Sequence, residues 1–96
     1  MIMDILYKPP FKKFVKKQSR AFQLAIEDAV EEIRNTPDRG EAKKGDLTGL
    51  RVHKFKFQRQ EYLIAYKEES NALIFCMVGT HENFYRELKQ YLREVE

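Results

Sequence analysis

The sequence predicts an α+β fold in which a helical hairpin packs on a mostly antiparallel sheet. Two stretches with helical apolar spacing come early in the chain, and three strand-like stretches follow a loop that contains three glycines. The predicted order is β-α-α-β-β-β-α, which is the order of an α+β sandwich. The 96 residues suffice for one domain, residues 1–96, with one core.

The N-terminal residues predict a strand and then a short helix. Met1 to Tyr7 alternates loosely and is rich in Ile, Leu and Tyr, which favours a strand. Pro9-Pro10 breaks this strand, and Pro10 opens a helix through Lys17 because proline is favoured in a first helical turn. The apolar side chains of this helix share one face, and its lysines share the other.

A second, longer helix follows. Ser19 is a suitable N-cap residue, and Pro37 ends the helix near Asn35 or Thr36. Its apolar residues recur with the spacing i, i+3, i+4, i+7, which is typical of a helix that buries one face. These residues are Phe22, Ala25, Ile26, Ala29, Val30 and Ile33.

The middle of the chain predicts a loop and a three-stranded meander. Asp38 to Gly49 contains three glycines and scattered charges, so we expect a loop. Leu50 to Phe57 alternates between two faces. Glu61 to Lys67 and Ala72 to Gly79 are apolar on both faces, as in central strands that are covered on both sides. The segment 67–71 predicts the hairpin turn that joins them.

The last predicted element is a helix that starts at Thr80 or His81. Its apolar residues form a stripe that would face the sheet. They include Phe84, Leu88, Tyr91 and Leu92.

Composition indicates a soluble, cytoplasmic protein. The longest apolar stretch, about 72–78, is far too short to cross a membrane, and the N-terminus lacks the apolar run of a signal peptide. The lone cysteine, Cys76, cannot form an internal disulfide, which suits a reducing compartment. Its apolar neighbours favour a buried small hydrophobe over the alternative, a reactive thiol.

Positive charge is concentrated in two segments, although the net charge is only +3. Residues 1–20 contain six basic residues against one acid, and residues 39–59 contain seven against two. Such clustering indicates a surface for a polyanion such as a nucleic acid, and the alternative is a solvated lysine-rich surface.

The residues that could carry chemistry are basic or transfer protons. The sequence has no phosphate-binding glycine loop, no dinucleotide fingerprint and no evident metal site, so we expect no cofactor. His81 and Tyr85 are four residues apart and would share a helix face. Basic residues line the strand segment 50–57 and its end: Arg51, His53, Lys54, Lys56 and Arg59. A histidine with nearby cations could support RNA cleavage by 2′-hydroxyl attack, and the alternative is a charged surface with capping residues.

Several motifs, in this order, make the chain similar to the RelE/ParE toxin superfamily. The match extends over almost the whole sequence. Its segments are Pro10–Phe14 with Ile33–Pro37 for the helical hairpin, Gly45–Lys54 for the start of the central sheet, Glu61–Tyr66 for the next strand, and Val78–His81 with Tyr85 for the C-terminal motif, which is nearest to that of YafQ-like members.

This resemblance implies a cytoplasmic bacterial toxin neutralised by a cognate antitoxin, which should be acidic because it must cover a basic surface. RelE-like members cut mRNA in the ribosomal A site, whereas ParE-like members inhibit DNA gyrase. His81 falls on the catalytic histidine of YafQ-like toxins, and Tyr85 on the aromatic residue that follows it. Lys54 and Lys56 fall on the basic strand positions.

The chain departs from the family pattern at two positions. Leu63 stands where a strand arginine is expected, and Glu82 where an arginine often follows the terminal histidine. Arg59 or Arg51 could supply the missing charge.

Three functions follow from the resemblance: a ribosome-dependent mRNA endoribonuclease without a metal, a gyrase inhibitor, and an inactive interaction module. The first is favoured by His81 and the strand lysines. Its catalytic residues would be His81, Tyr85, Lys54, Lys56 and Arg59. Its residues for RNA or ribosome binding would be Lys12, Lys13, Lys16, Lys17, Lys43, Lys44, Arg51 and His53.

Overall fold

A computed structural model describes residues 4–95 and confirms the predicted α+β fold. The predicted first strand began at Met1, and residues 1–3 lie outside the described part. The elements are β1 (Asp4–Tyr7), α1 (Pro9–Lys16), α2 (Arg20–Asn35), β2 (Glu41–Ala42), the 3-10 helix η1 (Gly45–Leu47), β3 (Arg51–Phe57), β4 (Gln60–Glu69), β5 (Ala72–Thr80) and α3 (His81–Val95).

The strands form one five-stranded sheet in the order β1-β5-β4-β3-β2. β1 runs parallel to β5, and the other neighbours are antiparallel. The strand β2 lies within the segment 38–49, which we predicted to be a loop. With two residues it is too short to show alternation, and its pairing of Glu41 with Val52 of β3 is a tertiary contact.

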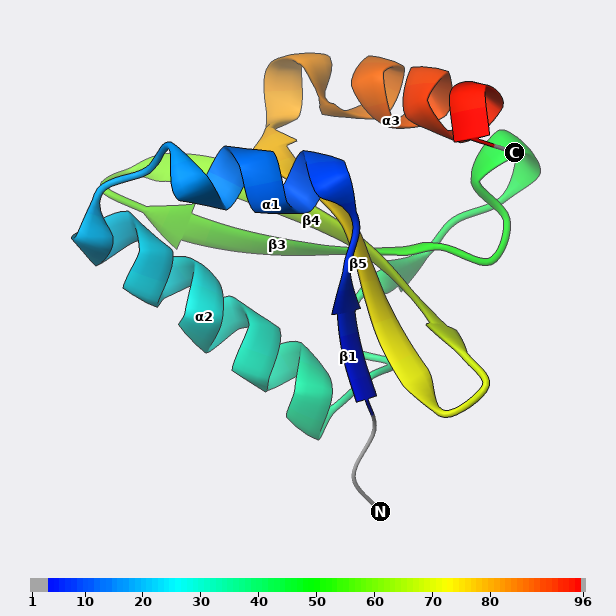
Figure 1. The fold of residues 1–96 in the computed structure, drawn as a ribbon, viewed down its shortest axis with the longest axis horizontal. Helices are drawn as coiled ribbons and strands as arrows, with labels where there is room; N and C mark the ends of the chain where they lie inside the picture. Colours follow the sequence, from blue (N-terminus) through cyan, green and yellow to red (C-terminus); the bar gives the residue numbers. More distant parts are fainter. Residues whose placement is uncertain (1–3, 96) are drawn as a thin grey trace.

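Helices cover both faces of the sheet (Figure 1). α1 and α2 bury one face, in a cluster that contains Phe22, Ile26, Ile33, Ile64, Tyr66 and Phe75. α3 and the segment around η1 bury the other face, in a cluster that contains Leu47, Val52, Leu63, Cys76, Phe84 and Leu88. This double burial explains why β4 and β5 are apolar on both sides.

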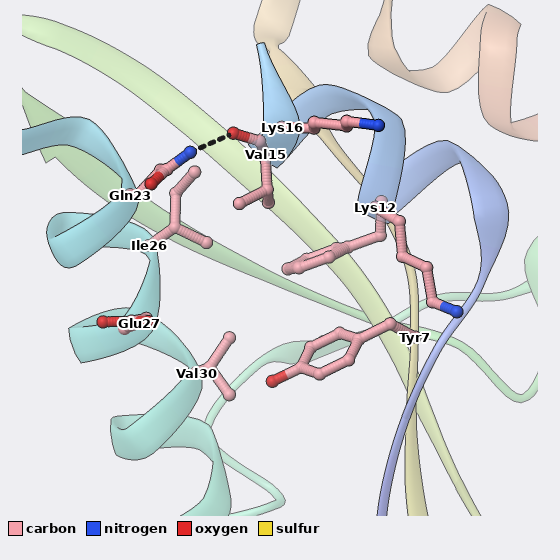
Figure 2. Close-up of a pocket in the computed structure, with 9 residues that line it drawn as sticks. Tyr7, Lys12, Val15, Lys16, Gln23, Ile26, Glu27 and Val30 are labelled. Atoms are coloured by element: carbon pink, nitrogen blue, oxygen red, sulfur yellow. Dashed lines mark hydrogen bonds between the residues drawn. The ribbon is translucent and has the colours of Figure 1, made fainter. Parts of the chain in front are cut away.

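Both helices of the N-terminal hairpin have the predicted ends to within one residue. The Ser19 hydroxyl accepts a hydrogen bond from the backbone N–H of Phe22 (3.2 Å), which caps α2. The side chain of Gln23 donates to the carbonyl of Val15 (2.9 Å) and joins α2 to α1, as Figure 2 shows.

A buried tyrosine fixes the connection between α2 and β2. The Tyr66 hydroxyl donates to the carbonyl of Pro37 (2.7 Å) and accepts from the N–H of Gly40 (2.9 Å). A Cβ atom on Gly40 would lie 2.7 Å from that hydroxyl oxygen, so glycine is required there. Arg51 also donates to the carbonyl of Gly40 (2.8 Å). These bonds hold β2, and with it Glu41, beside β3.

Two-residue turns connect β3 to β4 and β4 to β5. The first consists of Gln58 and Arg59 at φ values of 49° and 68°, and the second of Ser70 and Asn71 at 50° and 65°. Consecutive positive φ values are typical of type I′ turns, whose twist matches that of the flanking strands. The first turn therefore fixes Arg59 at the tip of the β3–β4 hairpin.

Candidate functional site

The start of α3 places the two C-terminal candidates together. His81 is exposed at the first position of α3, directly after β5 ends. The Tyr85 ring lies one helical turn further on, with its centroid 6.1 Å from that of His81 and the rings nearly perpendicular. Phe84, 1% exposed, anchors this first turn against the sheet. The sequence spacing of i and i+4 therefore does place both side chains on one helix face.

Lys43 joins this pair from the opposite edge of the fold. Its Nζ lies 5.1 Å from the centroid of the Tyr85 ring, and it forms an ion pair with Glu41. The hydrogen bond to the Glu41 carboxylate and the contact with Tyr85 raise the pKa of Lys43. Lys43 is therefore a firmly charged ammonium group held against the aromatic ring that follows His81.

Glu41 links this contact to the lysines of β3. Its strand partner Val52 is buried on the α3 side of the sheet, so Glu41 points to the same side as Lys54. The pKa of Glu41 is lowered by its hydrogen bond to Lys43, with a smaller contribution from the charge of Lys54. We call the five residues His81, Tyr85, Lys43, Glu41 and Lys54 the α3-side cluster.

The sheet register relates the β3 lysines to the end of β5. Lys54 pairs with Leu63, which in turn pairs with Gly79 of β5. Two strand spacings, about 10 Å, therefore separate the backbone of Lys54 from the end of β5, where His81 follows. Lys56 lies one pleat closer to the hairpin tip on the same face, opposite Glu61. Lys54 and Lys56 are exposed.

His53 lies apart from this cluster, on the α2 side of the sheet. It is 7% exposed, and its Nε2 is 3.5 Å from Oε2 of Glu32 without forming a hydrogen bond. Burial lowers the pKa of His53, and the Glu32 carboxylate opposes this effect. His53 therefore packs under α2 with little of its surface exposed.

The other predicted binding residues fall at three further places. Arg51 donates to the backbone carbonyls of Asp38 and Gly40 and so holds the loop before β2. Arg59 is exposed at the β3–β4 turn, and Lys44 is exposed before η1. The lysines of the α1 segment are also exposed, on the helix that covers the other face of the sheet: Lys12, Lys13, Lys16 and Lys17.

Sequence reasoning did not single out the two carboxylates of this surface. Glu41 lies in the segment predicted as a loop, where no periodicity revealed its orientation. Glu61 precedes Leu63 and Ala65 in the alternation of β4, so its face was predictable, but its pairing with Lys56 required the register. Both place negative charge beside the strand lysines.

A separate recess lies between α1, α2 and β1 (Figure 2). Its volume is about 320 Å³. Tyr7, Phe11, Val15, Ile26 and Val30 give it an apolar lining, and Lys12, Lys16, Gln23 and Glu27 complete it. It contains no residue of the α3-side cluster.

Other candidate features of the chain were also located. Cys76 is 2% exposed, as expected for a buried small hydrophobe. Within residues 4–95, no set of three or more His, Cys, Asp or Glu side chains is arranged to hold a metal ion.

Among the helices of residues 4–95, none combines the length and the apolar character needed to cross a bilayer.

The α3-side cluster combines a proton-transferring group with fixed cations. Histidine exchanges protons near neutral pH, and lysines and a tyrosine hydroxyl can contact phosphate oxygens. His81 and Lys54 are exposed and Tyr85 and Lys43 are half-buried, so the cluster lies at the protein surface.

Comparison with known proteins agrees with the fold. The model of a family described as ParE-like toxins of type II bacterial toxin–antitoxin systems matches residues 5–89. A free mutant form of the E. coli toxin RelE has a TM-score of 0.75 at 13% identity, with 100% of both chains covered. A chain of the E. coli RelBE toxin–antitoxin complex has a TM-score of 0.66 at 15% identity. The match covers 83% of this chain and 98% of that one.

A conserved hypothetical protein from Helicobacter pylori gives a TM-score of 0.53 at 18% identity, with 83% of this chain and 96% of that one covered. These identities are low, so the solved structures establish similarity of fold. No curated protein matches this chain.

Proposed function

This chain belongs to the ParE-like toxins of type II bacterial toxin–antitoxin systems, and from that premise we propose that it is a ribosome-dependent mRNA endoribonuclease that inhibits translation in the cytoplasm. Residues 1–96 would form its single toxin domain. The observation that carries this proposal is the α3-side cluster, because it groups the exposed His81 with the half-buried Tyr85 and Lys43.

The proposed reaction is attack of an RNA 2′-oxygen on the adjacent phosphorus, with departure of the 5′-oxygen. A base must accept the 2′-hydroxyl proton, and an acid must protonate the leaving oxygen. His81 is the general acid or base, and Tyr85 orients the substrate or transfers the second proton. Lys54, Lys56 and Arg59 stabilise the extra negative charge on the phosphate.

The missing strand arginine has a structural counterpart in this proposal. Leu63 is fully buried in the cluster that contains Phe84, so it supports α3 and offers no charge to a phosphate. Lys43 instead supplies a cation beside Tyr85. In this proposal the positive charge comes from the residue that follows β2 rather than from β4.

Inhibition of DNA gyrase is the second candidate function. It is favoured by the description of the matching family model, which is ParE-like. It agrees with the replacement of the expected arginines by Leu63 and Glu82. A gyrase inhibitor acts by binding, so its effect on cells would not depend on the His81 imidazole. An inactive interaction module, the third candidate, would leave both targets intact.

Induced expression distinguishes these functions. We expect the wild-type chain to arrest growth and to produce new mRNA 5′ ends at fixed positions within codons. His81→Ala should reduce cleavage by about 10²- to 10⁴-fold, the usual contribution of a general acid or base. Growth arrest with intact mRNA and altered DNA supercoiling would establish the gyrase function instead, and normal growth would leave the inactive module.

The proposed protein partner is an acidic antitoxin. Its negative charge would complement the lysines of α1 and β3, and an apolar segment would fit the recess between α1 and α2. A short acidic protein encoded beside this gene should therefore restore growth when it is co-expressed with the toxin. Failure of that protein to bind the purified chain would contradict this assignment.

A further inference from the structure

The ion pair between Glu41 and Lys43 belongs to the α3-side cluster. The Glu41 carboxylate contacts the Lys43 ammonium, and the positive charge of Lys54 also helps to lower the pKa of Glu41. The Lys43 ammonium in turn lies over the Tyr85 ring. A single carboxylate therefore lies against the ammonium group that contacts Tyr85, on the same side of the sheet as Lys54.

The two partners differ in how firmly they are held. The Lys43 side chain is 21% exposed and packs against Tyr85, whereas the Glu41 side chain is 70% exposed. Ion pairs with a solvent-exposed member are weak and easily exchanged. Glu41 can therefore swing into solvent while Lys43 stays beside Tyr85.

A carboxylate and a phosphodiester present the same chemistry to an ammonium group. Each carries one negative charge on two oxygen atoms that accept hydrogen bonds from a lysine. A phosphodiester placed at Lys43 would also be within the field of Lys54, which acts on Glu41 at the same point. The geometry thus offers one anion position with two alternative occupants.

We propose that Lys43, Lys54 and Tyr85 form a phosphodiester subsite and that Glu41 is its internal competitor, which an RNA phosphate displaces. This inference rests on the proposed function, because it names a further part of the same RNA-binding surface. In the free protein, Glu41 neutralises the subsite and weakens the binding of stray anions. With RNA bound, Lys43 transfers its ion pair from the carboxylate to the phosphate.

The test is a binding measurement that needs neither ribosomes nor cleavage. The probe is a trinucleotide whose middle nucleotide lacks the 2′-hydroxyl, titrated at low ionic strength while NMR follows the Tyr85 ring. Glu41→Gln should tighten binding about two- to fivefold, as expected for removal of an exposed ion-pair partner. Lys43→Met should weaken binding, and in that background Glu41→Gln should lose its effect.

The chain contains a matched control. Lys67 and Glu69 form a similar exposed ion pair, with 3.4 Å between Nζ and Oε2 and 61% exposure of the Glu69 side chain. Glu69→Gln makes the same change in net charge away from Tyr85, so its effect on binding measures the general loss of negative charge. An equal effect of Glu41→Gln and Glu69→Gln, or weaker binding by Glu41→Gln, would overturn the proposal.

Kinetics on ribosomes give a second readout. If Glu41 competes only for binding, Glu41→Gln lowers KM and leaves kcat unchanged, whereas a supporting role in the chemistry would lower kcat. The two proposals also fail separately. Trinucleotide binding that responds to Glu41 without any mRNA cleavage would preserve the phosphodiester subsite and remove the nuclease function.

Discussion

His53 is buried beneath α2, whereas His81 is exposed at the start of α3. Because burial lowers the pKa of His53 below the ordinary value of about 6.5, the unfolded chain binds a proton more readily than the folded one. The folded state is therefore most stable above a pH of about 6.5, where His53 is neutral in both states. Its stability falls as the pH decreases towards the lower, folded-state pKa of His53.

This linkage gives a prediction for stability. The free energy of unfolding should decrease between pH 7 and pH 5, and replacement of His53 by Leu should flatten this part of the profile. Urea unfolding at each pH provides the measurement. Equal slopes for the wild type and the His53 variant would refute the assignment.

At the residue scale, the sequence predicted contacts that are close in the chain and missed those that are distant. The pairing of His81 with Tyr85 follows from helix geometry alone. The contact of Lys43 with Tyr85 joins residues 42 positions apart and requires the whole sheet to be assembled. Lys43 was predicted as a binding residue from local charge, without its aromatic partner.

At the element scale, α3 is essential to the fold because it covers one face of the sheet. Leu88 on α3 is fully buried, whereas Leu24 on α2 is 45% exposed. We expect Leu88→Ala to reduce the free energy of unfolding by about 2–5 kcal/mol, as for other buried leucines. Leu24→Ala should change it by much less. Similar losses for the two variants in denaturant unfolding would show that α3 is not packed as described.

The long elements were predictable because periodicity repeats over many residues, and the short ones were not. α2 has its predicted cap at Ser19 and its predicted buried face. β2 contains two residues and is fixed by Tyr66 and Arg51, which lie on other strands. The element that carries Glu41 was thus invisible to pattern analysis, although it borders the proposed site.

At the scale of the whole molecule, the basic residues occupy two separate surfaces. The Cα atoms extend over 34 × 32 × 21 Å, and the sheet separates the α1 side from the α3 side. We propose that the α3 side performs the chemistry and that the α1 lysines bind ribosomal RNA. Charge clustering in the sequence predicted both basic segments, but their separation follows from the fold.

This division predicts different effects of removing charge. Replacement of four lysines by glutamine should weaken ribosome binding: Lys12, Lys13, Lys16 and Lys17. The affinity should also depend less on salt concentration, since fewer counterions are released. The cleavage rate at saturating ribosome concentration should stay near that of the wild type. Replacement of Lys54 and Lys56 by glutamine should instead lower the cleavage rate at saturating ribosome concentration. A loss of saturated rate in the α1 variant would contradict the division.

The central claim is that this toxin cuts mRNA by 2′-hydroxyl attack on the ribosome. The most direct measurement adds the purified chain to ribosomes programmed with a defined mRNA and locates any cut by primer extension. We predict a single cut in the A-site codon, which disappears when the nucleotide before the cut lacks its 2′-hydroxyl and when His81 is replaced by Ala. Intact mRNA on wild-type ribosomes, together with inhibition of purified gyrase by the same chain, would contradict the claim.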